Sequence, residues 1–305
     1  MVKKIIIGSR GSKLALIYAQ IAKDTIVQNT DLNNGDIVIK PITTSGDQVK
    51  DVRLSEVGGK GLFSKNIEIE LQNKKIDLAV HALKDLPAKE TNGLITNIFL
   101  KRNDPREILV TSDKKKLNDL KTNAIVGTSS FRREFQLKKI RSDLNYKLIR
   151  GNIDTRIKKL NEGLYDAIIL SFAGVNSLNM NDNISEIFSV KDIIPSAGQG
   201  IISLQCREDD KDLISILKKI NHKETYEVAS AERNVLKVLE GDCETAVGAH
   251  AVLKGDEIIL EAELFSLDGK HRFYEKKSSK KKNAQDLGKE VGQLLKTKSN
   301  NSYKR

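Results

Sequence analysis

The sequence of 305 residues lacks tryptophan and carries only four prolines, two methionines, two cysteines and four histidines. Aromatic residues make up 5% of the chain, which disfavours the base-stacking surfaces of proteins that bind single-stranded nucleic acid. No apolar run approaches the roughly 20 residues that a membrane-spanning helix needs. With 39% hydrophobic and 30% charged residues, the composition is typical of a soluble globular protein.

The scarcity of cysteine and histidine limits the possible chemistry. Cys206 and Cys243 could form one disulfide at most, and both are interpreted as thiols. The histidines are scattered without HExxH or Cys-His spacing, so the sequence indicates no metal site. The apolar stretch after Met1 gives way to Gly8 too soon for a secretory leader, which predicts a cytoplasmic protein.

Positive charge is in excess. A net charge of +11 and a pI near 9.4 indicate anionic partners: nucleic acid, membrane headgroups or a small polyanion. Part of the excess lies in the lysine-rich carboxyl end, where residues 296–305 are predicted to form a frayed polar terminus.

The order of apolar patterns predicts two α/β units and a small α+β unit. Expected strands of the first two units lie at 3–8, 36–43, 77–85, 108–111, 124–127, 147–150 and 167–172, and their helices at 12–28, 62–71, 131–141 and 153–161. A late strand at 201–206 is expected to return to the first sheet, and 44–60 is interpreted as a lid or binding loop. The third unit has expected helices at 225–239 and 284–295 and strands at 247–253, 258–266 and 272–276.

The apolar run at 77–85 ends in a lysine and an aspartate. In open α/β sheets, ligands bind beyond the carboxyl ends of the strands, where Lys84 and Asp85 are expected. A carboxylate partly desolvated by Leu83 and Leu86 could donate a proton or stabilise a developing cation. The alternative is a purely structural ion pair between Lys84 and Asp85 at the mouth of the strand.

Three turns share one arrangement: a strand end, small polar residues, and arginine at the start of a helix. They are 8–12, 127–133 and 150–156. Arginine in the first turn of a helix opposes the helix dipole, so these turns predict a bound anion, either phosphate or carboxylate. If they lie on the same sheet edge, they would form one anion pocket; the alternative is arginines placed there by chance. Neither GxxxxGK[ST] nor GxGxxG is present, which disfavours nucleotide binding.

Cys243 lies in an expected turn between a helix and a strand, among acidic neighbours. Such neighbours raise the pKa of a thiol and disfavour a fast thiolate nucleophile, but they allow attachment to a strong electrophile. Structural and functional interpretations of Cys243 both stay open, whereas Cys206 is interpreted as a packed core residue.

Taken together, these motifs resemble the porphobilinogen deaminase (hydroxymethylbilane synthase) family of tetrapyrrole biosynthesis. The matching segments follow one another in family order: 8–10, 58–63, 80–87, 127–133, 150–156, 197–200 and the turn around Cys243.

The resemblance implies three domains. Domain 1 comprises 1–100 with 200–220 and domain 2 comprises 101–199, both like lobes of type II periplasmic binding proteins. Domain 3, a small α+β unit, comprises 221–305. In such enzymes a cysteine matching Cys243 carries a dipyrromethane cofactor through a thioether, and four porphobilinogen molecules are joined head to tail into hydroxymethylbilane. The residue matching Asp85 assists loss of ammonia and stabilises an azafulvene-like cation.

The resemblance also implies which residues bind the acetate and propionate groups of cofactor and substrate. They are Arg10, Ser12, Lys84, Thr128, Ser130, Arg132, Arg133, Arg150 and Arg156, with Gln199 lining the cleft. A cytoplasmic monomer that binds neither nucleic acid nor membrane is expected. Each pyrrole brings two carboxylates, which agrees with the need for several guanidinium groups.

The chain departs from the family pattern at a few positions. The family usually has Ser at Ala82, Arg at Ser177, Lys at Glu56, Gly at Asp242 and Pro at Ala246. The change at Ser177 removes one expected anion contact, and the change at Glu56 puts a role for that position in doubt. Two other hypotheses are a non-catalytic anion-binding protein on the same scaffold and a nucleic-acid binder with steeply salt-dependent affinity.

Overall fold

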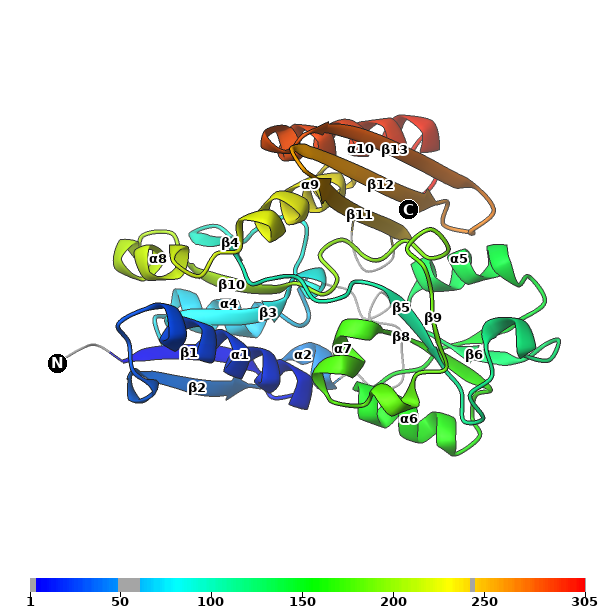
Figure 1. Ribbon diagram of the computed structural model, residues 1–305, viewed down its shortest axis with the longest axis horizontal. Coiled ribbons are helices and arrows are strands. Elements are labelled where there is room, and N and C mark those ends of the chain that lie inside the picture. Colours follow the sequence, from blue (N-terminus) through cyan, green and yellow to red (C-terminus); the bar gives the residue numbers. More distant parts are fainter. Residues whose placement is uncertain (1–3, 49–60, 242–244, 305) are drawn as a thin grey trace.

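The computed structural model describes residues 4–48, 61–241 and 245–304. These residues form three sheets, and Figure 1 shows two α/β lobes side by side with a third unit above them. The fold class expected from the sequence, two lobes of the type II periplasmic-binding-protein kind with a small α+β unit, is confirmed.

The first lobe is a five-stranded sheet in the order β2-β1-β3-β10-β4. Its strands are β1 (Ile5–Arg10), β2 (Ile37–Ile42), β3 (Leu78–Ala82), β4 (Leu94–Phe99) and β10 (Ile202–Arg207). Its helices are α1 (Lys13–Asn29), α2 (Ser45–Gln48), α4 (Lys65–Gln72) and α8 (Lys211–Lys218). Side chains of α1 and α8 pack on one face of the sheet and those of α4 on the other, so β3 is buried on both faces and reads as an apolar run.

The second lobe repeats this plan with the order β7-β6-β8-β5-β9. Its strands are β5 (Glu107–Val110), β6 (Ile125–Gly127), β7 (Asn145–Lys147), β8 (Ala167–Ser171) and β9 (Glu186–Ile187). Its helices are α5 (Phe131–Ile140), α6 (Ile153–Asn161) and α7 (Phe172–Ser177). β8 lies between β6 and β5 and is buried along its whole length.

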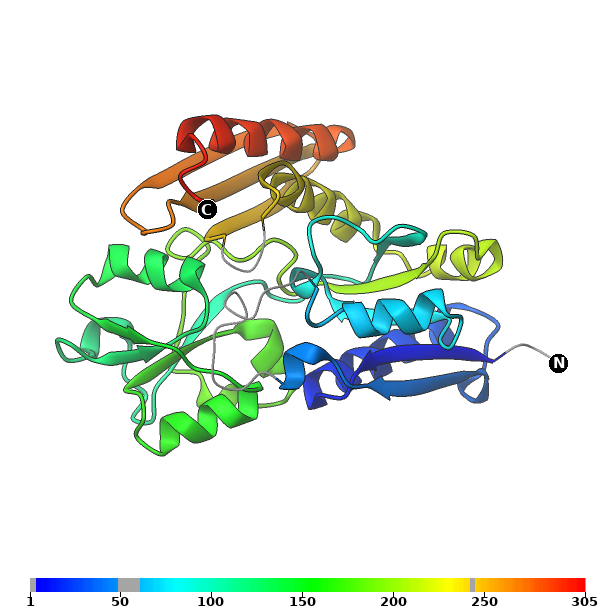
Figure 2. The same ribbon diagram turned by 180° about the vertical axis from the view of Figure 1, so that it is seen from behind.

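The third unit packs two helices on one face of a three-stranded sheet. Its elements are α9 (Lys223–Leu239), β11 (Val247–Lys254), β12 (Glu257–Phe265), β13 (Arg272–Lys280) and α10 (Ala284–Ser299). Both helices contribute to the core of this unit, and Figure 2 shows α10 in red running along the sheet. α10 approaches α9 closely at Gly288, where an added Cβ would lie 2.1 Å from the carbonyl oxygen of Ala231. Short 3₁₀ helices complete the fold at Asn34–Asp36, Leu83–Asp85, Leu117–Asp119, Asn181–Asn183 and Lys281–Asn283.

The chain crosses twice between the lobes, and α9 of the third unit holds the two crossings together. Asn103 N donates to Gly200 O at 2.8 Å, which pairs one crossing with the other. Glu232 of α9 is fully buried; its carboxylate accepts from Arg102 Nη1 at 2.6 Å and from Gly198 N at 2.7 Å. Both crossings are therefore hydrogen-bonded to the third unit.

Several sequence-based expectations are corrected. The strand expected at 147–150 ends at Lys147, and the strand expected at 77–85 ends at Ala82, after which Lys84 and Asp85 lie in a 3₁₀ turn. β4 and α8 were not predicted; the pairing of β10 with β4 shifts register between Leu204 and Cys206, which interrupts the alternation that reveals a strand. β10 does return to the first sheet, as expected, and lies antiparallel to β3 and β4.

The carboxyl end is also more ordered than predicted. α10 continues to Ser299, and the Tyr303 side chain is 2% exposed with its hydroxyl donating to Leu239 O at 3.1 Å. A single buried aromatic residue thus anchors a segment whose composition is polar. Cys206 lies in the core of the first lobe, as expected.

Candidate active site

A cavity of about 1030 Å³ lies between the two lobes. Seven of the predicted site residues line it: Arg10, Ser12, Lys84, Asp85, Arg133, Arg150 and Arg156. Lys13 and Lys159, which were not predicted, line it as well. The wall therefore combines seven cationic side chains with the carboxylates of Asp85 and Asp154, and its excess of positive charge favours a polyanionic ligand.

The sequence led us to expect that the arginine-bearing turns share one sheet edge, but they lie on two different sheets. Arg10 ends β1 in the first sheet, whereas 127–133 and 150–156 follow β6 and β7 in the second. The two sheets present their carboxyl edges to the same cavity from opposite lobes. The expectation of one anion pocket therefore holds, but it depends on how the lobes face each other.

Asp85 lies on the first-lobe wall of the cavity. Its Oδ2 is 4.0 Å from Arg10 Nη1, and its side chain keeps 37% of its surface exposed. Leu83 and Leu86 are buried beside it, so the carboxylate is only partly desolvated. The Arg10 guanidinium stacks over the Phe63 ring at 4.0 Å from its centroid, which fixes its position beside the carboxylate.

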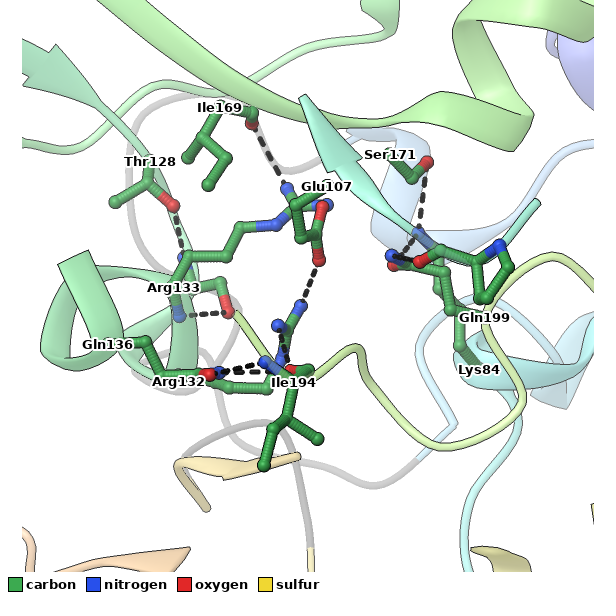
Figure 3. A network of polar contacts seen from close by, with 12 residues as sticks. Lys84, Glu107, Thr128, Arg132, Arg133, Gln136, Ile169, Ser171, Ile194 and Gln199 are labelled. Atoms are coloured by element: carbon green, nitrogen blue, oxygen red, sulfur yellow. Dashed lines mark hydrogen bonds and ion pairs between the residues drawn. The ribbon is translucent and has the colours of Figure 1, made fainter. Parts of the chain in front are cut away.

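Lys84 points across to the second lobe. Its Nζ donates to Gln199 Oε1 at 3.1 Å and to Ser171 Oγ at 3.4 Å, as Figure 3 shows. Among the residues that the structure describes, Lys84 and Asp85 do not form the ion pair that the sequence left open. Burial lowers the pKa of Lys84 to about 8, and the Arg133 guanidinium acts in the same direction.

The consecutive arginines of α5 share one buried carboxylate that the sequence did not reveal. Glu107, fully buried at the start of β5, accepts from Arg132 Nη2 at 2.6 Å and from Arg133 Nη2 at 2.8 Å (Figure 3). Burial alone would raise the pKa of Glu107, but the guanidiniums of Arg133 and Arg132 outweigh it and lower the pKa to about 2. Glu107 carried no sequence signal because its partners lie 25 and 26 residues away.

Four other predicted binding residues do not line the cavity in the part of the chain that the structure describes. They are Thr128, Ser130, Arg132 and Gln199. Ser130 caps α5 by accepting from Arg133 N, and Thr128 Oγ1 accepts from Ser130 N at 3.1 Å. Gln199 accepts from Lys84 and donates through Nε2 to Pro105 O at 2.7 Å. Their side chains shape the wall from behind.

Arg156 on α6 adds to the crowding of cations. Its Nε donates to Gly151 O at 2.8 Å. Burial lowers the pKa of Arg156 to about 10, and the guanidiniums of Arg133 and Arg150 lower it further. A bound anion would offset the repulsion that the guanidiniums of Arg133 and Arg150 exert on Arg156.

Two findings concern what the described residues lack. Residues 4–48, 61–241 and 245–304 contain no group of three side chains placed to hold a metal ion. Within the same ranges, no helix has the length and hydrophobicity to cross a membrane. Cys243, the predicted attachment residue, and Glu56 and Asp242 lie outside these ranges.

The two lobes, the cationic cavity and the carboxylate on its wall define an α/β enzyme that binds a polyanionic substrate and can stabilise positive charge as it develops. The chain belongs to the porphobilinogen deaminase family. The family model described as "Porphobilinogen deaminase, dipyromethane cofactor binding domain" matches residues 5–215, and that of the "Porphobilinogen deaminase, C-terminal domain" matches residues 226–297.

Curated relatives agree. The porphobilinogen deaminase of Desulforamulus reducens is 39% identical over 297 residues, covering 97% of this chain and 95% of that protein. That of Oceanobacillus iheyensis is 42% identical over 294 residues, covering 96% and 94%. The expected enzyme class is confirmed: the chain is a transferase of tetrapyrrole biosynthesis, a hydroxymethylbilane synthase that uses a dipyrromethane cofactor.

Solved structures are more distant. The periplasmic VFT2 domain of Bordetella pertussis BvgS is 13% identical, covers 72% of this chain and 86% of that one, and has a TM-score of 0.44. The probable amino-acid transporter binding protein YtmK of Bacillus subtilis is 14% identical, covers 72% and 90%, and has a TM-score of 0.42. Similarity at this level carries no argument about function.

The residues of the cavity fit a dipyrromethane. Two pyrrole rings bring four carboxylates, and the wall offers an excess of cationic side chains from both lobes. Arg133 lines the cavity and keeps a buried Nε that has no hydrogen-bond partner in the described structure. When bound, this group supplies the pyrrole carbon to which the first substrate is joined.

Proposed function

We propose that Asp85 is the catalytic group of this hydroxymethylbilane synthase. As a proton donor it would assist loss of the substrate's amino group as ammonia, and as a carboxylate it would stabilise the cation that remains. The observation that carries this proposal is its place on the wall of a cavity otherwise rich in cations, 4.0 Å from Arg10 Nη1.

The acetate and propionate groups of porphobilinogen and of the cofactor would bind to the wall of the cavity. The proposed contacts are Arg10, Ser12, Lys84, Arg133, Arg150 and Arg156. Thr128, Ser130, Arg132 and Gln199 would support these contacts from behind, through the hydrogen bonds described above. Guanidinium groups suit this role because they bind carboxylates in a two-pronged geometry.

Cys243 is proposed as the attachment residue of the dipyrromethane. It belongs to the connection between α9, which ends at Leu239, and β11, which begins at Val247. α9 also donates through Arg233 Nη1 to Leu86 O at 2.9 Å, so the helix that leads to Cys243 contacts the residue that follows Asp85.

Intact mass spectrometry tests this attachment. The purified protein should exceed its sequence mass by one dipyrromethane adduct, and Cys243→Ser should lose that adduct. Cys206→Ala is the matched control, because Cys206 is buried in the core of the first lobe and should leave the adduct in place. Unmodified protein with full activity would refute the proposal.

We further propose a cytoplasmic monomer divided into domain 1 (1–100 with 200–220), domain 2 (101–199) and domain 3 (221–305), with no nucleic-acid partner. The separate sheets of the three units support this division. Light scattering of the purified protein checks the monomer, and limited proteolysis near the crossings checks the domain limits.

A further inference from the structure

We propose that Glu107 is a positioning residue for the reaction: its buried carboxylate holds the Arg133 guanidinium at the cavity wall and joins it, through Arg132, to one of the two crossings between the lobes. The inference rests on the proposed role of Arg133 in binding substrate or cofactor carboxylates.

Arg132 and Arg133 point in different directions from α5. Neighbouring residues in a helix project about 100° apart, so Arg132 and Arg133 cannot both face the cavity from the first turn of α5. Arg133 lines the cavity, whereas Arg132 Nη1 donates to Ile194 O at 2.8 Å. Glu107 lies between them and accepts one hydrogen bond from each guanidinium.

Side chains of α5 anchor the helix to the backbone of Ile194. Gln136, one turn after Arg132, accepts from Ile194 N at 2.6 Å and donates to Ile194 O at 3.0 Å. The backbone of Ile194, at the start of the second crossing, is therefore held by two side chains of α5. Arg133 in turn donates through Nη1 to Ile169 O of β8 at 3.2 Å. The Arg133 guanidinium is thus fixed to the sheet and, through Glu107 and Arg132, to the crossing.

The two arginines carry more positive charge than the Glu107 carboxylate can neutralise. Two guanidiniums in the first turn of α5 oppose the helix dipole and each other, and both residues are at most 8% exposed. One carboxylate cannot neutralise two cations, so Glu107 fixes the arginines and leaves a net positive charge beside the cavity. Without Glu107, Arg133 would lose one of the contacts that orient it and would face the Arg132 guanidinium. The carboxylate of Glu263 would still act on Arg132, but the two form no ion pair in the described structure.

The nearby Lys84 supplies a measurable signature. The charged groups that act on Lys84 are Arg133 and Arg132 of α5, Glu107 of β5 and Asp85 of its own turn. Glu107 favours the protonated ammonium, so removing its charge should make Lys84 lose its proton at lower pH. On the alkaline side of the pH profile (its alkaline limb), the pH at which carboxylate binding weakens should then be lower.

The test compares Glu107→Gln and Glu107→Asp with the wild-type holoenzyme. For Glu107→Gln we expect the KM for porphobilinogen to rise about tenfold, as for loss of one oriented charge-assisted contact, with a several-fold smaller fraction of protein carrying the adduct by intact mass. The alkaline limb of kcat/KM should move to lower pH by roughly half a unit. Glu107→Asp keeps the charge, so it should leave the limb in place, but its shorter side chain should raise KM about threefold.

Asp77→Asn is the matched control. Asp77 forms another buried pair with an arginine, Arg207, at the opposite end of β3 from Asp85. Its loss should lower the unfolding temperature while KM, adduct fraction and pH limb stay unchanged. If Glu107→Gln is folded and changes these quantities no more than Asp77→Asn does, the inference is wrong.

Two further outcomes are decisive. If Glu107→Gln does not fold, Glu107→Asp decides: an unchanged KM together with full adduct loading would overturn the positioning role. Arg133→Lys separates this inference from the proposed function. If Arg133→Lys leaves KM and loading unchanged, the proposed role of Arg133 fails; if it alters both while the Glu107 variants do not, only the positioning role fails.

Discussion

Two fully buried glutamates, Glu232 and Glu107, differ in the number of arginines that surround them. Glu232 pairs with one arginine, Arg102, and accepts from the backbone N–H groups of Gly198 and Ala251. Glu107 pairs with two arginines, of which one lines the cavity. The first cluster is balanced in charge, and the second is not.

This difference indicates which buried charges serve architecture and which serve binding. A buried ion pair that is balanced and fully hydrogen-bonded has no electrostatic reason to attract a ligand. A buried cluster with surplus charge beside a cavity is stabilised when an opposite charge binds. The Glu232 cluster accordingly joins the three units, whereas the Glu107 cluster borders the site.

Replacement of Asp85 should give the largest functional effect. Asp85→Asn keeps the size of the side chain but removes the acid, and we expect kcat to fall by about 10²–10⁴-fold. The midpoint of thermal unfolding should change little, because the side chain is 37% exposed. Ammonia release in a single turnover measures the effect; near-normal release would exclude the proposed roles.

Replacement of Glu232 should have the opposite pattern. Glu232→Gln leaves Arg102, whose side chain is 12% exposed, as an uncompensated cation, and we expect a loss of about 3 kcal/mol in the free energy of unfolding. The KM of the molecules that remain folded should be near normal. Denaturant titration measures the loss, and Arg102→Met combined with Glu232→Gln should recover part of it. A raised KM without loss of stability would contradict the conclusion that the Glu232 cluster serves architecture and not binding.

The helix that carries Glu232 also depends on close packing against α10. Gly288→Ala places a methyl group 2.1 Å from Ala231 O, and we expect a loss of about 1–3 kcal/mol through displacement of the helices. Gly35→Ala is the control, because nothing lies within 4 Å of the added Cβ there. The midpoints of thermal unfolding of the two variants are compared. Equal midpoints would show that α9 and α10 can move apart without a loss of stability.

The smallest effect concerns pH. Burial lowers the pKa of Lys84 from 10.5 to about 8, so the ammonium that attracts carboxylates is lost as pH rises through about 8. We expect the KM for porphobilinogen to rise by up to about tenfold per pH unit above that value. The unfolded chain keeps this proton to higher pH, so deprotonation of Lys84 favours the folded state in the same range and cannot explain the loss as unfolding.

Lys84→Arg is the control for this pH dependence, because a guanidinium stays charged throughout the range. Its KM profile should be flat where that of the wild type rises. A rise of the same size in the variant would assign the limb to another group.

Much of the site could be predicted locally. The turns 8–12, 127–133 and 150–156 were found because arginine at the start of a helix opposes the dipole, and that conflict is visible in a few neighbouring residues. The carboxylates that pair with buried or half-buried arginines were missed. Glu107 lies 25 and 26 residues from Arg132 and Arg133. Glu232 lies 130 residues from Arg102, and a glutamate in an amphipathic helix resembles a solvated one until its partner is known.

Most of the strands and turns, the positive excess and the acidic residue after the third strand followed from the sequence alone, since periodicity, turn chemistry and charge are properties of short segments. Which cations face the cavity, and which are neutralised behind it, became known from the folded arrangement of the chain. That outcome depends on contacts between residues far apart in the chain, and on two sheets that present their edges to one another.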